Sequence, residues 1–296
     1  FVMALETILC DGLSASIDSM GAQLMSLKVA DAEYLWQGNP DFWPRRAPVL
    51  FPCVGCLKDD ASESAQGPVH LKRHGIARLY DHEVVSNDGK KVVFELTSSE
   101  KTKEAFPFDF KLNMEYEVDG TSLTQTFRVT NTGDVELPFT LGGHPAFNVP
   151  VPGADDESFE DYKLVFAEPW CAKTPKIDEA GLHDFSRMTT LFEDAREMDL
   201  SHAQIEQLLT LVFCDVPNYR VSLVGKKSGH GVELEFPGFD YLGVWTASAD
   251  APFVAIEPWH GCADAYDESG KFEDKRDTIE LAPGCETELA FTITPF

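Results

Sequence analysis

A chain of 296 residues, of which 43% are hydrophobic and 25% charged, is long enough to bury a large core and has the composition of an ordinary globular protein. Its 24 Lys and Arg residues against 50 Asp and Glu residues give a formal net charge of −26, which repels phosphate backbones and anionic membrane surfaces. We therefore expect neither nucleic acid nor a membrane as a partner, and we expect the acidic side chains to coat the surface.

Cysteine usage and the absence of long apolar runs indicate a cytoplasmic protein. The seven cysteines show no disulfide framework in their spacing, which favours a reducing compartment. Cys53 and Cys56 have the CxxC form, but no second such pair and no nearby histidine pair completes a zinc site, so we expect no bound metal. The first residues lack a basic segment followed by an apolar one, and nowhere do about 18 apolar residues run together.

Short strands are expected along most of the chain, because apolar and polar residues alternate between turn signals. The strands predicted from this alternation cover residues 7–10, 13–17, 23–29, 34–36, 79–85, 91–97, 110–118, 121–131, 137–141, 163–166, 220–224, 232–236, 241–246, 278–281 and 288–294. Asp119-Gly120 between two of them is a strong signal for a two-residue hairpin.

Two stretches depart from this pattern. We interpret residues 174–196 as a long loop with short strands, and residues 201–209 as a helix with Ser201 at its N-cap. No linker and no internal repeat divides the chain. The prediction is therefore one domain over residues 1–296 with an all-β fold, a large antiparallel β-sandwich.

Glu257 is a carboxylate inside an otherwise apolar run, residues 251–261. Phe253 and Ala255 indicate a strand, which we expect to end at Pro258 because proline has no N–H for the ladder. A buried Glu needs hydrogen-bond or charge partners. Glu257 is accordingly either a salt-bridged residue at a strand end or a functional group.

Two histidines lie at predicted strand ends. His144 follows Gly142-Gly143 and precedes a proline, and His74 precedes Gly75 at a loop-to-strand junction. Each either points into a pocket or caps a tight turn. We expect their side chains to meet that of Glu257 on one concave face of the sandwich.

A proline-rich segment, residues 41–55, carries Arg45 and Arg46 among aromatic residues. It contains too many prolines for a central strand. Arginines in such an apolar loop either line a cleft or stay solvated on a packed crossover.

Five segments, in the same order along nearly the whole chain, resemble the aldose 1-epimerase (galactose mutarotase) family, and its LacX-like branch most of all. The segments are Trp43-Pro44-Arg45-Arg46-Ala47-Pro48-Val49-Leu50-Phe51-Pro52-Cys53-Val54-Gly55, His74-Gly75-Ile76-Ala77-Arg78, His144-Pro145-Ala146-Phe147-Asn148, Leu242-Gly243-Val244-Trp245 and Ile256-Glu257-Pro258-Trp259-His260-Gly261. The resemblance implies a galactose mutarotase-like β-supersandwich, a sugar as the substrate and no cofactor.

The resemblance also implies roles for individual residues. Glu257 matches the general base that takes the proton from the anomeric hydroxyl, and His144 matches the general acid that protonates the ring oxygen. His74 matches the second histidine, which binds near the ring oxygen. With ordinary pKa values near 4.3 for Glu and 6.5 for His, we expect an ionised Glu257 that keeps His144 protonated.

Substrate-binding roles follow from the same resemblance. Arg45 matches the arginine of the branch's Trp-x-Arg-x-Ala-Pro segment, and Arg46 stands beside it. Phe147 and Trp245 are expected to offer apolar faces to the sugar ring.

One departure from the family concerns Cys56, which stands where many relatives have a basic residue that can reach the sugar. We expect Arg46, Lys58 or Arg73 to replace that contact, or the pocket to prefer a different substituent on the sugar.

The sequence supports three functions. The first is an aldose 1-epimerase acting on a free hexose, and the second is a mutarotase for a phosphorylated hexose. The third is a carbohydrate-binding protein without catalysis. The second function would need several basic groups around the phosphate, and the candidates in one region of the sequence are Arg45, Arg46, Lys58, Arg73 and Arg78. An intact Glu257 with both histidines argues against the third. The identity of the sugar and the oligomeric state stay open.

Overall fold

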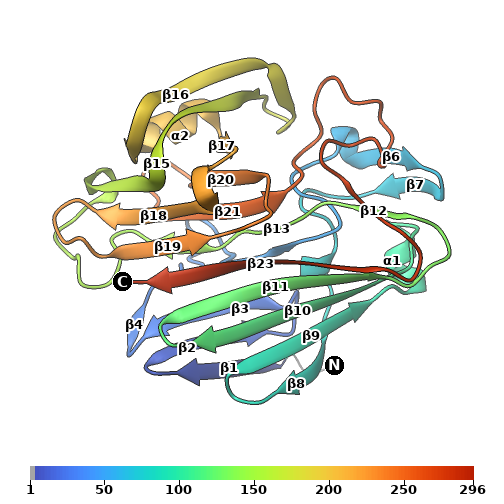
Figure 1. The fold of residues 1–296 in the computed structure, drawn as a ribbon, viewed down its shortest axis with the longest axis horizontal. Helices are drawn as coiled ribbons and strands as arrows, with labels where there is room; N and C mark the ends of the chain where they lie inside the picture. Colours follow the sequence, from blue (N-terminus) through green and yellow to red (C-terminus); the bar gives the residue numbers. More distant parts are fainter. Residues whose placement is uncertain (1–3) are drawn as a thin grey trace.

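The computed structural model describes residues 4–296 as layered antiparallel sheets, in which one large sheet carries two smaller ones (Figure 1). The large sheet has nine strands in the order β16 (His183–Asp199), β15 (Tyr162–Ile177), β18 (Arg220–Gly225), β19 (Gly231–Glu235), β23 (Glu286–Pro295), β11 (Ser122–Asn131), β10 (Phe110–Asp119), β9 (Lys91–Thr97) and β8 (Glu83–Asn87).

The smaller sheets lie over different parts of the nine-stranded sheet. One consists of β1 (Leu5–Cys10), β2 (Leu13–Asp18), β3 (Gln23–Val29) and β4 (Ala32–Glu33). The other runs in the order β17 (Leu211–Cys214), β20 (Tyr241–Trp245), β21 (Phe253–His260), β13 (Leu141–Gly143) and β5 (Val49–Leu50), and β14 (Ala146–Asn148) also pairs with β21. We call this second one the six-stranded sheet.

The remaining elements are short. Two-stranded ribbons are formed by β6 (Ala61–Ser64) with β7 (Gly67–His70) and by β12 (Leu137–Phe139) with β22 (Ile279–Leu281). The helices are α1 (Glu100–Lys103) and α2 (His202–Leu208), with 3₁₀ turns at Lys58–Asp60, Ala77–Leu79, Phe159–Asp161 and Pro217–Tyr219. None of the helices within residues 4–296 is long and apolar enough to cross a membrane.

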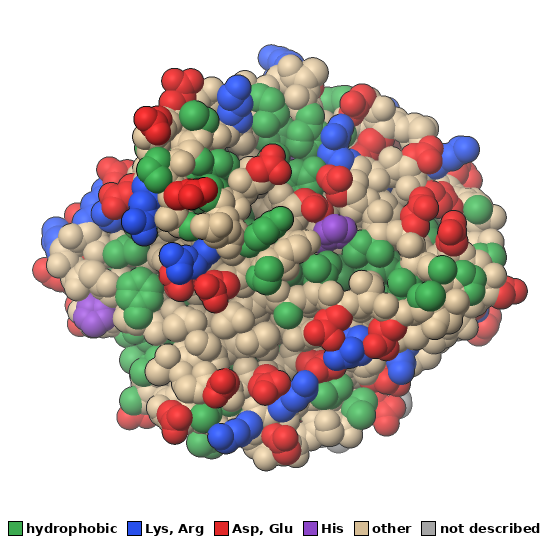
Figure 2. All heavy atoms as spheres, viewed as in Figure 1, with side chains coloured by type: hydrophobic (Ala, Val, Ile, Leu, Met, Phe, Trp, Pro, Cys, Tyr) green, Lys and Arg blue, Asp and Glu red, His purple; other side chains and the backbone are tan. Residues whose placement is uncertain are grey.

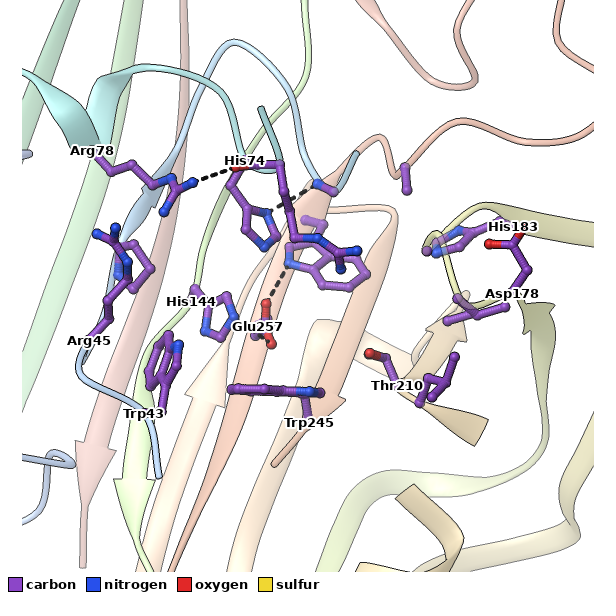
Figure 3. A pocket seen from close by; sticks show the side chains of 18 of the residues that line it. Trp43, Arg45, His74, Arg78, His144, Asp178, His183, Thr210, Trp245 and Glu257 are labelled. Carbon is purple, nitrogen blue, oxygen red and sulfur yellow. Dashed lines mark hydrogen bonds and ion pairs between the residues drawn. The ribbon is translucent and has the colours of Figure 1, made fainter. Parts of the chain in front are cut away.

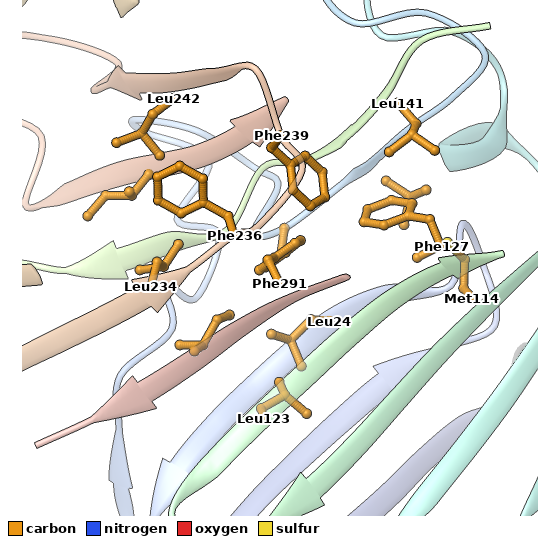
Figure 4. Packing of buried hydrophobic residues seen from close by; sticks show 14 of the residues in the cluster. Leu24, Met114, Leu123, Phe127, Leu141, Leu234, Phe236, Phe239, Leu242 and Phe291 are labelled. Atoms are coloured by element: carbon orange, nitrogen blue, oxygen red, sulfur yellow. The ribbon is translucent and has the colours of Figure 1, made fainter. Parts of the chain in front are cut away.

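The main core lies between the nine-stranded sheet and the two smaller sheets (Figure 4). Successive side chains of a strand point to opposite faces, so β11 places Phe127 and β23 places Phe291 on the inner face. Leu24 from β3 and Leu242 from β20 pack against this face from the two smaller sheets. One continuous core therefore holds all three sheets together.

The outer face of the nine-stranded sheet is polar. Arg128 on β11 forms ion pairs there with Glu115, Glu286 and Glu288 on the neighbouring strands. Acidic side chains are spread among Lys and Arg over the face shown in Figure 2. The strong negative charge thus coats the surface, as expected from the composition.

The predicted all-β antiparallel sandwich is confirmed. The helix is also confirmed, since the Ser201 side chain accepts a hydrogen bond from the N–H of Gln204 at the start of α2. In the β10–β11 hairpin, Asp119 pairs with Ser122, so the two turn residues are Gly120 and Thr121, one position later than predicted.

Four predictions of secondary structure were wrong. The strand predicted over residues 79–85 begins only at Glu83, because Leu79 belongs to the 3₁₀ turn Ala77–Leu79. Residues 174–196 belong to the long hairpin β15–β16 and are not a loop. Residues 34–36 contain no strand, because only a single bridge from Leu35 to Phe147 forms there. Pro258 does not end its strand, since β21 continues to His260. The proline nitrogen points to the side of β21 where His144 and Pro145 separate β13 from β14. No ladder hydrogen bond is needed at that position, so proline is tolerated there.

Candidate functional site

The six-stranded sheet has one face toward the main core and an opposite face that forms the floor of a cavity. In β21, Val254 and Ile256 enter the main core, whereas Ala255 and Glu257 face the other way. Its neighbour β20 places Trp245 on the same opposite face. The strand alternation therefore sets a carboxylate into a surface that is otherwise apolar.

His144 joins Glu257 because β13 is paired with β21 just before the histidine. Gly142 pairs with Trp259, and the chain then leaves β13 at His144. Nε2 of His144 lies 3.2 Å from Oε1 of Glu257, and the two residues are only 6% and 2% exposed (Figure 3). The carboxyl and the imidazole thus lie within hydrogen-bond distance of each other at the bottom of the cavity.

Burial governs the protonation of this pair. It raises the pKa of Glu257 well above its ordinary value and lowers the pKa of His144 to about 3. Desolvation therefore works against the ionised Glu257 and protonated His144 that we expected from ordinary pKa values, because it penalises both charged forms. Burial thus favours the neutral carboxyl and the neutral imidazole, which lie close enough to share one proton between Oε1 and Nε2.

His74 approaches the same point from the loop after β7. The N–H of Gly55 donates to its Nδ1 at 3.2 Å, so the proton of the neutral ring sits on Nε2. Its ring meets that of His144 edge to face, with centroids 5.5 Å apart. Burial lowers the pKa of His74 well below its ordinary value, so this histidine is a neutral N–H donor.

The loop that carries His74 is tightly fixed. His74 and Gly75 both have positive φ, 69° and 68°. A Cβ on Gly75 would lie 2.4 Å from the backbone oxygen of Phe51, so only glycine fits there.

Aromatic side chains enclose the pair. Trp43 stacks on His144 with ring centroids 4.8 Å apart, and Trp245 meets His144 edge to face at 5.6 Å. Trp245 thus lies on the cavity wall, where sequence analysis expected it, and Trp43 forms a second wall. Both offer flat apolar faces of the kind on which sugar rings pack.

The cavity has a volume of about 400 Å³ and two ends of different character. Arg45 and Arg78 lie side by side at one end, with the histidines and Glu257 between them and the opposite end (Figure 3). Asp178, His183 and Thr210 line that opposite end. Nδ1 of the buried His183 has no hydrogen-bond partner within residues 4–296.

The residues at this second end were not predicted from the sequence. They lie in or next to β15, β16 and β17, a region interpreted mainly as a loop, and no motif singled them out.

Two predicted substrate-binding residues lie elsewhere. Arg46 donates from Nη1 to the carbonyl oxygen of Met25 at 2.7 Å and does not line the cavity, because adjacent residues of an extended segment point to opposite sides. Phe147 is fully buried in the main core. It stands three positions after His144, an odd offset that turns its ring away from the cavity.

Cys56 is buried and directs its thiol to the carbonyl oxygen of Ala180 at 3.2 Å. Of the three basic residues considered as replacements, only Arg73 lines the cavity; it donates to the same carbonyl oxygen. Lys58 is exposed, and its backbone N–H is donated to Asp264.

A β-sandwich with a paired carboxyl and imidazole at the bottom of a polar cavity has the layout of an enzyme that uses acid and base groups. The sequence matches the aldose 1-epimerase family over residues 7–284. Protein LacX of Lactococcus lactis subsp. lactis is 30% identical over 290 residues, which cover 95% of this chain and 96% of that protein.

Solved structures agree. A galactose mutarotase related enzyme from Lactobacillus acidophilus superposes with a TM-score of 0.92 at 30% identity, covering 99% of this chain and 97% of that one. A galactose mutarotase-like protein from Lactobacillus casei gives a TM-score of 0.90 at 27% identity, with coverage of 99% and 100%. The chain therefore belongs to the aldose 1-epimerase family and is an isomerase.

Proposed function

We propose that this protein is an aldose 1-epimerase that interconverts the α and β anomers of a hexose by acid and base catalysis at Glu257 and His144. The observation that carries the proposal is the 3.2 Å separation of Oε1 and Nε2 at the bottom of an aromatic-walled cavity. A cavity of about 400 Å³ holds a pyranose ring with room to spare.

The reaction starts when the shared proton lies on His144. Glu257 removes the proton from the anomeric hydroxyl, His144 protonates the ring oxygen, and the bond between C1 and the ring oxygen breaks to give the open-chain aldehyde. After rotation about the C1–C2 bond, His144 takes the proton back from the C5 hydroxyl as its oxygen attacks C1. Glu257 returns its proton to O1, so the pair ends as it began.

His74 supports this exchange without changing charge. Its Nε2–H is free to donate to the ring oxygen or to the hydroxyl that replaces it, because Nδ1 already accepts from Gly55. A neutral donor stabilises developing negative charge on oxygen and does not compete for the shared proton.

A sugar that carries an anionic group, such as a hexose phosphate, is the second candidate substrate. Arg45, Arg73 and Arg78 line the cavity, and none of them forms an ion pair with a carboxylate in the described part of the chain. Nε of Arg78 is buried and has no hydrogen-bond partner among residues 4–296. Burial, and then the neighbouring charge of Arg45, lower the pKa of Arg78, which a bound anion would relieve.

The test is mutarotation of freshly dissolved α-galactose, α-glucose and α-glucose 6-phosphate, followed by polarimetry and by exchange of the anomeric proton signals. Wild type and Glu257→Gln are compared at equal concentration. Acceleration by wild type alone supports the epimerase and ranks its substrates. Binding of one of these sugars without any acceleration would favour the carbohydrate-binding function instead.

A further inference from the structure

We propose that Trp259 is a positioning residue for the proposed reaction: its indole N–H holds Oε2 of Glu257, so that only Oε1 faces His144 and the anomeric hydroxyl. This inference rests on the proposed function for its meaning in catalysis, although the contact itself can be tested without it.

The contact is a hydrogen bond between two buried groups. Nε1 of Trp259 donates to Oε2 of Glu257 at 3.2 Å, while Oε1 lies at the same distance from His144. The two carboxylate oxygens thus have different partners on different sides. An indole N–H only donates, so it can never take the proton that the carboxylate must accept and return.

The two side chains meet because they stand two positions apart on β21 and therefore share a face. Trp259 lines the cavity floor and packs below it against Leu50, Val54 and Tyr241. An aromatic residue of this size on a cavity floor is ordinary packing. To reach back to Glu257, however, the indole must lie flat against the sheet.

Two glycines on the neighbouring strands make the room. A Cβ on Gly243 of β20 would lie 2.4 Å from Cζ2 of Trp259. A Cβ on Gly142 of β13 would lie 2.8 Å from Cδ1 of Trp259 and 2.7 Å from the backbone oxygen of Pro258. The indole therefore spans both neighbours of β21, its five-membered ring over one glycine and its six-membered ring over the other. Gly243 is also the residue paired with Glu257.

Neither glycine is required by its own backbone conformation, although at Gly142 the backbone oxygen of Pro258 also leaves no room for a Cβ. Neither is among the glycines of positive φ in the described chain, so another residue could adopt the same backbone conformation. Both are fully buried in the sheet, where glycine weakens a strand. At Gly243 the three atoms nearest to such a Cβ all belong to the indole, so this glycine provides the space that Trp259 occupies, which we call its seat.

The seat has a chemical consequence for the carboxyl group. Together with the charge of Arg73, the indole N–H opposes the rise in the pKa of Glu257 that burial causes, and the indole has the larger effect of the two. It favours the ionised carboxylate, and hence the arrangement with the proton on His144 from which the reaction starts.

The test compares Trp259→Phe with Gly243→Ala, which leaves the indole in the chain but removes its seat. For both we expect kcat to fall about tenfold with KM within about threefold, and the alkaline limb of the kcat profile to move up by about one pH unit. Trp170→Phe is the matched control, because that indole lies outside the cavity and its N–H has no partner within residues 4–296. If Trp259 had only a structural role, the substitutions would lower the maximal kcat without shifting the alkaline limb of the pH profile.

A second readout does not need turnover. The infrared C=O band of protonated Glu257, identified by subtraction of Glu257→Gln, is titrated in wild type and in Trp259→Phe. We expect the band to persist to a pH about one unit higher in the variant. If Trp259→Phe leaves both this titration and the alkaline limb at their wild-type positions, the proposal is overturned. If no tested sugar turns over but the titration shifts, the proposed function fails while the contact between Trp259 and Glu257 stands.

Discussion

Nε2 of His144 and Oε1 of Glu257 lie 3.2 Å apart, and burial shifts their pKa values in opposite directions, so it favours two neutral groups that share one proton over a carboxylate beside an imidazolium. A carboxylate and an imidazolium in water would need no such sharing. When the pair carries one proton, the group that holds it can act as the acid, and the other group is free to accept a proton as the base. The two residues are therefore best treated as one titrating unit.

The pH dependence follows from this unit. Activity needs one proton on the pair. Below about pH 3, the second proton binds His144 and the base is lost. Above the raised pKa of Glu257, the shared proton leaves and the acid is lost. We measure kcat/KM as a function of pH and subtract the rate of Glu257→Gln. We expect kcat/KM to stay constant over a pH range wider than the interval between the ordinary pKa values near 4.3 and 6.5. A bell with limbs at those two ordinary values would contradict the shared proton.

Glu257→Gln should abolish catalysis and leave sugar binding measurable. The amide keeps the size of the side chain but cannot accept the anomeric proton, so we expect kcat to fall at least about 10³-fold. Binding is measured by calorimetry and turnover by anomeric proton exchange. A variant that retains most of the wild-type rate would remove Glu257 as the base.

His74→Asn should separate the two roles of this histidine, namely the hydrogen bond that Nδ1 accepts and the one that Nε2–H is proposed to donate to the sugar. Asn tolerates positive φ, and its side-chain oxygen can accept the N–H of Gly55, but it cannot extend a donor to the position of Nε2. We expect wild-type thermal stability, a loss of about 10²-fold in kcat/KM, and no change in the positions of the pH limbs, since His74 is neutral throughout. A limb that moves with this substitution would show that His74 itself titrates in the reaction.

Much of this arrangement could be predicted from the sequence. Alternation within strands and the motifs around Glu257, His144 and His74 indicated both the sandwich and the three residues that meet. The alternation fails in β15 and β16, where several residues are exposed on both faces and the register shifts at bulges. It therefore could not predict that this hairpin closes one end of the cavity.

The orientation of individual residues was harder to predict than their proximity. Arg45 and Arg46 have the same chemistry and are adjacent, yet only Arg45 lines the cavity. Without a ladder to fix which side an extended segment presents, the residue pattern does not choose between them; only the family resemblance favoured Arg45, and it left Arg46 as a second candidate. Arg78, in contrast, follows His74 by four positions in a motif, and its buried Nε is visible only in three dimensions.

Arg78→Met should distinguish the two candidate substrates. If the arginine end of the cavity binds a phosphate, KM for glucose 6-phosphate should rise about 10- to 100-fold while KM for glucose changes less than about threefold. Arg46→Met is the matched control, because that guanidinium is bound to Met25 outside the cavity. Equal effects of Arg78→Met on both sugars would argue that the anion is not a natural part of the substrate.

Gly75→Ala tests how far the position of His74 depends on its loop. An added Cβ would lie 2.4 Å from the backbone oxygen of Phe51 at a φ of 68°, so steric overlap and backbone strain act together. We expect a loss of about 3 kcal/mol or more in the free energy of unfolding, measured by urea denaturation. Gly120→Ala is the control: it has a similar φ of 56° but open space around it, so it should cost only about 1 kcal/mol and leave activity unchanged. Equal losses for both variants would mean that strain alone, and not the contact with Phe51, fixes the loop.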